Sequence, residues 1–80
     1  MSPPTVFREG PFRFYFFSRE EERMHVHVMC GDGEAKIWLE PEIEVAVSYG
    51  MRPQQVRAAL KMVEERSDEI RYEWNRHFSG

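Results

Sequence analysis

The sequence contains a single cysteine, Cys30, so it has no pair that could form an intramolecular disulfide. No apolar run approaches the ~18–20 residues that are needed to cross a bilayer. The first residues lack the basic segment and apolar run of a secretory signal. These absences argue against a secreted or membrane-spanning protein, and we expect a cytoplasmic protein that does not associate with a membrane.

Motifs of the common enzyme classes are also missing. The sequence has no Gly-rich phosphate loop, no Cys-x-x-Cys pair and no Gly-x-Ser-x-Gly elbow. Its 11 basic and 14 acidic side chains give a net charge of −3, which disfavours binding to nucleic acid by bulk electrostatics. The chain of 80 residues is too short to enclose a cofactor, and we expect none. Any catalysis would act on a substrate bound at the surface.

Aromatic residues, in contrast, are plentiful. Six Phe, three Tyr and two Trp can supply a hydrophobic core, because each buried aromatic side chain removes roughly 150–250 Å² from water. We expect one domain over residues 1–80, with a flexible tail at 1–4, an antiparallel sheet over 5–40 and helices over 41–78.

Residues 5–18 predict two strands. Thr5–Glu9 is a short candidate, and residues 12–18 (FRFYFFS) place phenylalanines at every second position. The even-numbered phenylalanines are the more apolar set, so we expect the odd-numbered side chains to lie on the opposite face. The charged run at 19–23 (REEER) predicts a solvated loop.

Residues 25–40 (HVHVMCGDGEAKIWLE) predict a β-hairpin around the turn CGDG. In the symmetric register the numbers of paired residues add up to 63, so that Val26 faces Ile37 and His27 faces Lys36. One face of the hairpin is then aliphatic, and the other is polar and aromatic. A slip of one residue would mix the two sets, so the pattern itself selects this register.

The rest of the chain predicts helices. Pro41 suits the first turn of a short helix that would run through Tyr49 and end at Gly50. Apolar residues then recur at helical spacing over residues 53–78, with a bend near Ser67. We therefore predict an α+β fold in the order ββββαα, a four-stranded antiparallel sheet with the helices packed on one face.

The uncovered face of this sheet is the candidate site. It would carry Arg13, Tyr15, His25, His27, Glu34, Lys36 and Trp38. Two imidazoles, a lysine, an arginine, a carboxylate and two large aromatic rings form an unusual set of groups to leave facing water. They form no recognised motif.

One interpretation of His25 and His27 is metal binding, with Glu34 as a further oxygen ligand. Two histidines spaced two apart on a strand project side by side. A third and a fourth ligand are missing, however, because Cys30 lies on the core side and His77 on a distant helix.

A second interpretation is acid–base chemistry on a phosphodiester, with His25 and His27 as the acid–base residues and Lys36 or Arg13 steadying the developing charge. A third treats the two histidines as packing residues that stack on the rings of the same face. The spacing is generic, which favours packing.

Several segments together resemble the uncharacterised bacterial family DUF4160. They are PTVFREGPFRFYFFS, HVHV, GEAKIWLEP, SYG and a helix of the type VEERSDEIRYEWNRHF, and they cover residues 3–78. The most characteristic pieces are the His-x-His segment at 25–27, the start of the next strand at 34–36, and Trp74. Members often carry two prolines before the His-x-His segment, where this sequence has Arg23 and Met24.

The resemblance implies a small prokaryotic protein, often encoded beside a second small domain, DUF2442, in pairs that look like toxin–antitoxin modules. In such a pair this chain would be the toxin-like or partner-binding member. The resemblance carries no established catalytic residue.

Two functional hypotheses from different classes therefore remain, with metal binding as a third. The preferred one is a protein-interaction module of a two-protein pair, which binds a small protein partner through the aromatic sheet face or by strand addition at an open edge. The alternative is a small RNA-directed nuclease with His25 and His27 as the acid–base pair. Self-association of the chain is compatible with either.

Overall fold

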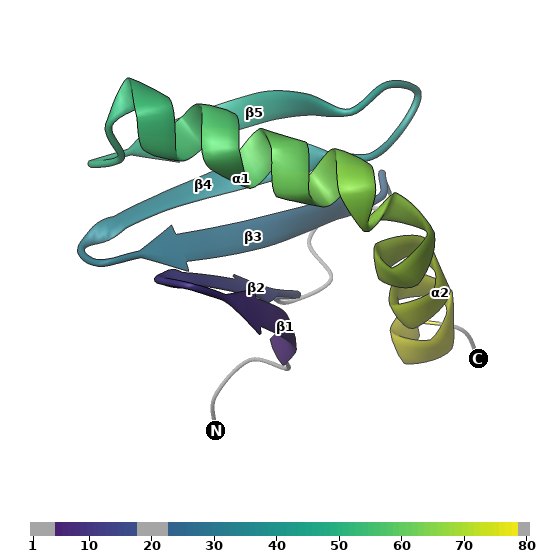
Figure 1. Cartoon of the computed structure of the whole chain (residues 1–80). Helices are drawn as coiled ribbons and strands as arrows, with labels where there is room; N and C mark the ends of the chain where they lie inside the picture. Colours follow the sequence, from purple (N-terminus) through teal and green to yellow (C-terminus); the bar gives the residue numbers. More distant parts are fainter. Residues whose placement is uncertain (1–4, 18–22, 79–80) are drawn as a thin grey trace.

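The computed structural model describes residues 5–17 and 23–78. The elements are β1 (Thr5–Glu9), β2 (Phe12–Tyr15), β3 (His25–Cys30), β4 (Gly33–Trp38), β5 (Glu44–Tyr49), α1 (Pro53–Glu65) and α2 (Ser67–Phe78). The strands form one antiparallel sheet in the order β1-β2-β3-β4-β5. α1 lies across one face of this sheet, and α2 turns away from α1 at one end of the strands (Figure 1).

The predicted α+β class and the two C-terminal helices are confirmed, but the predicted count of four strands is wrong. The helix expected from Pro41 to Tyr49 is instead an irregular segment followed by β5, which pairs with β4. Ile43, Val45, Val47 and Tyr49 alternate with smaller or polar residues, and this period of two is typical of a strand. Pairing with β4 satisfies backbone groups that a helix would leave unpaired on the edge of that strand.

The central hairpin has the predicted register. Val26 pairs with Ile37 and His27 with Lys36, as the sum of 63 requires. Neither Val26 nor Ile37 has any exposed surface. The alternation along these two strands therefore determined which face became the core.

The second strand is shorter than the predicted 12–18, because β2 ends at Tyr15, but its side chains divide between the two faces as predicted. Phe12, Phe14 and Phe16 are buried in the core cluster, whereas Phe17 is exposed. Tyr15 lies with the odd-numbered set but is buried as well. The predicted tail at residues 1–4, and residues 19–22 of the predicted charged loop, lie outside the described residues.

The helices supply the other half of the core. Ala59 and Val63 of α1 and Ile70 of α2 are fully buried against the sheet, and Trp74 is almost so. Each fully buried Val, Leu, Ile or Phe side chain contributes roughly 1.5–3 kcal/mol relative to an exposed one. This apolar layer holds both helices on one face of the sheet.

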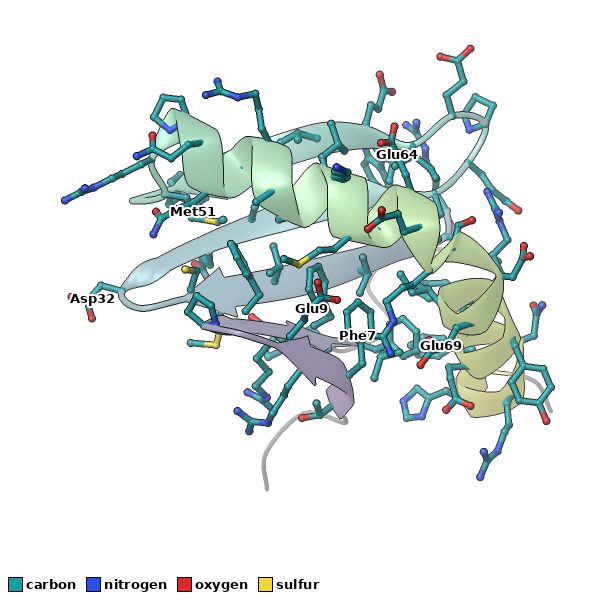
Figure 2. The ribbon with its side chains drawn as sticks, in the orientation of Figure 1. Phe7, Glu9, Asp32, Met51, Glu64 and Glu69 are labelled. Carbon is teal, nitrogen blue, oxygen red and sulfur yellow. The ribbon has the colours of Figure 1, made fainter. Side chains whose placement is uncertain are left out.

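The predicted bend falls at Arg66, between α1 and α2. The Arg66 guanidinium lies over the Phe7 ring, 3.7 Å from its centroid, and 3.5 Å from the Glu9 carboxylate. It also contacts Glu69 at 3.0 Å, and Figure 2 shows Phe7 of β1 and Glu69 of α2 beside this junction. Arg66 therefore ties the helix junction to the first strand.

Candidate functional site

The sheet face opposite the helices, here called the open face, is organised in rows of directly paired residues. The first row is Arg8, Arg13, Met29, Glu34 and Tyr49. The second row is Thr5, Tyr15, His27, Lys36 and Val47. The third row is His25, Trp38 and Glu44. Residues that are paired across strands point to the same face, so the rows bring together all seven residues that the sequence singled out.

His25 departs from the expectation that both imidazoles face solvent. Its side chain is only 3% exposed, and its ring lies 5.7 Å from the ring of Trp38 and 5.1 Å from that of Trp74. α2 passes the end of the sheet where β3 begins, so Trp74 covers this corner. The ring nitrogen Nδ1 is 2.8 Å from the Arg23 carbonyl oxygen, which can only accept, so Nδ1–H is the donor.

His27 is half-buried among aromatic rings. It stacks on Tyr15, with ring centroids 5.4 Å apart and planes 23° apart. Phe17 meets it edge-on at 6.0 Å, and His25 meets it edge-on at 5.2 Å. These contacts match the packing interpretation of the two histidines. A catalytic role for either one stays a prediction.

Two cationic side chains gather at Trp38, at one corner of the open face. The Arg23 guanidinium lies 4.1 Å from the centroid of the indole, and the Lys36 ammonium lies 4.4 Å from it. Arg23 also donates from Nε to the carbonyl oxygen of Glu40, at 2.6 Å, and its Nη2 lies 3.3 Å from Oε1 of Glu44. The contact with the indole directs the Lys36 ammonium toward Trp38. Lys36 lies on β4, whereas Arg8 lies on β1, at the opposite edge of the sheet from β5.

A cavity of about 330 Å³ opens in the middle of the face. It is lined by Tyr15, Phe17, His27, Glu34, Ala35, Lys36, Val47 and Tyr49. The lining is largely aromatic and aliphatic, with one carboxylate and one ammonium group. A volume of this size is at the lower limit of small-ligand pockets, and it suits one or two large side chains of a binding partner.

The surroundings of Tyr15 change the pKa of its hydroxyl group. Burial raises the pKa of the Tyr15 hydroxyl above its ordinary value of 10, and the negative charge of Glu34 raises it further. The positive charge of Arg13, whose guanidinium carbon lies 5.0 Å from the centroid of the Tyr15 ring, lowers the pKa and opposes these effects. Tyr15 is therefore a neutral phenol at physiological pH.

Two lining residues, Val47 and Tyr49, were not among the predicted site residues. They lie on β5, in the segment where a helix was predicted. The register between β4 and β5 skips Ala46, so that Val45 faces the core while Val47 and Tyr49 face the cavity. The alternation of apolar residues from Ile43 to Tyr49 was the signal that could have found them.

Comparison with known families gives one result. The family described as a domain of unknown function (DUF4160) matches residues 11–75. The chain belongs to this family. No curated protein and no solved structure matches the chain. The match runs from the turn before β2 into α2, and it includes every predicted site residue of this DUF4160 domain.

The DUF4160 domain has little on this face that would hold a metal ion. Over residues 5–17 and 23–78, no group of three or more His, Cys, Asp or Glu side chains is arranged to do so. Cys30 is buried on the core side as predicted, with Gln55 Nε2 at 3.4 Å from its sulfur. None of the described helices is long and apolar enough to span a membrane.

Proposed function

We propose that this DUF4160 domain is a protein-interaction module that binds a small protein partner through its open face. The observation that carries the proposal is the distribution of exposed hydrophobic side chains. Five large ones are exposed over the described residues, and four of them lie on the open face: Phe17, Met29, Val47 and Tyr49. The fifth, Tyr72, is on α2.

Such a cluster has a physical meaning. Monomeric proteins rarely expose contiguous apolar patches larger than a few hundred Å², and the largest patch on a protein is often a contact site. The core of a protein interface is typically rich in Tyr, Phe, Met and Arg and poor in Lys and Glu. The open face carries Tyr, Phe, Met and Arg side chains of this kind. It also carries Glu34 and Lys36, and charges beside an apolar contact can select the orientation of a partner.

The partner belongs to a two-protein pair encoded by neighbouring genes, in which this chain is the toxin-like or partner-binding member. This part of the proposal is supported by the family resemblance. The position of His25 also favours a binding module over a two-histidine nuclease. A buried imidazole whose Nδ1–H is engaged by a backbone carbonyl does not reach a substrate that lies on the surface.

The test compares two tyrosines of equal exposure. Tyr49, on the open face, is 65% exposed, and Tyr72, on α2, is 66% exposed. The protein encoded by the neighbouring gene is purified, and its affinity for the wild type, Tyr49→Ser and Tyr72→Ser is measured by calorimetry. Loss of an interfacial tyrosine costs about 2 kcal/mol or more, so Tyr49→Ser should weaken binding at least about 30-fold. Tyr72→Ser should bind as the wild type does.

Other outcomes would overturn the proposal or support its toxin-like part. Equal weakening by the two substitutions would place the contact elsewhere, and unchanged binding in Tyr49→Ser would remove the open face from it. Cleavage of RNA by the wild-type chain, lost in His27→Ala, would establish the nuclease instead. Growth arrest on expression of the chain alone, relieved by the neighbouring gene, would support the toxin-like role.

A further inference from the structure

The edge of the open face formed by β1 and β2 places two arginines directly opposite each other. Arg8 of β1 pairs with Arg13 of β2, so both side chains leave the sheet on the same side. Side chains that are paired in this way have Cβ atoms about 4.5–5.5 Å apart, and like charges in such pairs are destabilising. The fold thus places two arginines at directly paired positions where a neutral pair would cost less.

We propose that Arg8 and Arg13 form a binding site for a phosphate group. Guanidinium groups bind phosphate through two parallel charge-assisted hydrogen bonds, and an anion between the two arginines replaces their repulsion with attraction. The site borders the apolar groups of the proposed partner contact and shares Arg13 with it, but its test does not depend on that proposal. It contains one predicted binding residue, Arg13, and one that the sequence did not single out, Arg8.

The surroundings of Arg13 keep its guanidinium in place. Its Nε donates to the Thr5 hydroxyl at 2.9 Å, and its guanidinium carbon lies 5.0 Å from the centroid of the Tyr15 ring. An arginine that is already oriented loses less side-chain entropy when an anion binds. Thr5 lies in the second row of the open face, directly opposite Tyr15.

The nearby carboxylates leave room for an anion at Arg8. Arg8 is exposed and forms no ion pair within residues 5–17 and 23–78. Glu9, the next residue along β1, is paired with Arg66 at the helix junction. In the first row, Met29 lies between Arg13 and Glu34, whose backbones are two strands apart, or about 10 Å at the usual strand spacing.

The phosphate could be the free ion or part of a nucleotide. Tyr15 connects the two halves of the face, because it contacts Arg13 on one side and lines the central cavity on the other. A nucleotide with its phosphate at the two arginines would therefore have its base next to Tyr15, Phe17 and His27, and aromatic rings of this kind stack on bases.

The experiment titrates isotope-labelled wild-type protein with inorganic phosphate and, separately, with adenosine monophosphate, while chloride keeps the ionic strength constant. NMR follows the backbone amides and the arginine Nε–H groups. We expect saturable shifts at Thr5, Arg8 and Arg13 with both ligands. Tighter binding of the nucleotide, with added shifts at Phe17 and His27, would identify a nucleotide as the source, and equal binding would identify the free ion.

Three variants of equal charge change decide the assignment. Arg8→Gln and Arg13→Gln should each weaken phosphate binding about tenfold, because each removes a charge-assisted contact. Arg57→Gln, on the exposed side of α1, should leave the affinity unchanged. Shifts that do not saturate, equal losses in all three variants, or acetate binding as tightly as phosphate would overturn the proposal.

Discussion

The indole of Trp74, near the end of α2, lies 5.1 Å from the imidazole of His25, the first residue of β3. The same indole meets Phe16 edge-on at 5.5 Å. One side chain of the last helix thus closes the end of the sheet and buries a histidine that its strand alone would leave in solvent.

Replacing Trp74 by alanine should therefore destabilise the protein strongly. Loss of a buried Trp costs about 3–5 kcal/mol in the free energy of unfolding, and urea denaturation would measure it. Tyr72→Ala, two residues away on the exposed side of α2, should change stability by less than about 0.5 kcal/mol. Similar losses in the two variants would show that α2 does not close the sheet through Trp74.

The ionisation of Tyr15 gives a second prediction. Because Glu34 raises its pKa and Arg13 lowers it, Glu34→Gln should lower the pKa of Tyr15 and Arg13→Gln should raise it. NMR of labelled tyrosine ring carbons separates Tyr15 from the exposed Tyr49 and Tyr72. Shifts of the same sign in the two variants would contradict the described arrangement of these charges.

The raised pKa of Tyr15 also makes stability depend on pH. The folded state favours the neutral phenol, so Tyr15 contributes fully to stability at pH values below about 10, its pKa in the unfolded chain. This contribution is lost as the pH rises through the higher pKa of Tyr15 in the folded state. Alkaline unfolding, followed by circular dichroism, should be shallower in Tyr15→Phe than in the wild type. An identical alkaline slope would indicate that Tyr15 titrates normally.

Gly33, at the start of β4, is predicted to tolerate no side chain. A Cβ atom there would lie 2.6 Å from the Gly50 carbonyl oxygen and 2.6 Å from Met51 Cγ, and Figure 2 shows Met51 near the hairpin end that Asp32 marks. Met51 can move, but the backbone of Gly50 cannot do so cheaply. Gly33→Ala should cost about 1–3 kcal/mol, measured by urea denaturation.

Gly10→Ala is the matched control for this steric effect. A Cβ atom at Gly10 meets nothing within 4 Å, although its φ of 55° is unfavourable for alanine. Gly10→Ala should therefore cost only the conformational term of about 1–2 kcal/mol, and its amide spectrum should change only near the β1–β2 turn. Gly33→Ala should in addition shift the amide signals of Gly50 and Met51, and their absence would contradict the close approach.

Arg66 should contribute more than an ordinary surface arginine. Its contacts with Phe7, Glu9 and Glu69 combine a cation–π interaction with two ion pairs at the helix junction. Arg66→Gln should lower the free energy of unfolding by about 1–2 kcal/mol. Arg76→Gln, whose pair with Glu73 is highly exposed, should change it by less than about 0.5 kcal/mol. Equal effects in thermal unfolding would argue against a special role for Arg66.

The central hairpin and the two C-terminal helices follow from local patterns in the sequence. The alternation of valines and histidines before the turn, and of Ala35, Ile37 and Leu39 after it, admits one register because any slip would bury charges. The period-two phenylalanines of β2 and the helical periodicity after Pro53 likewise identify their buried sides without reference to other elements.

The fifth strand and the burial of His25 depend instead on contacts between distant parts of the chain. Residues 43–49 carry helix-compatible and strand-compatible signals together, and the free edge of β4 determined which of them prevailed. The position of His25 in the alternating pattern of β3 indicates which face of the sheet its side chain is on. It does not indicate how exposed the side chain is, because the residue that covers it, Trp74, lies 49 positions later in the chain. Local sequence specifies which way a side chain points, whereas long-range packing specifies what it meets there.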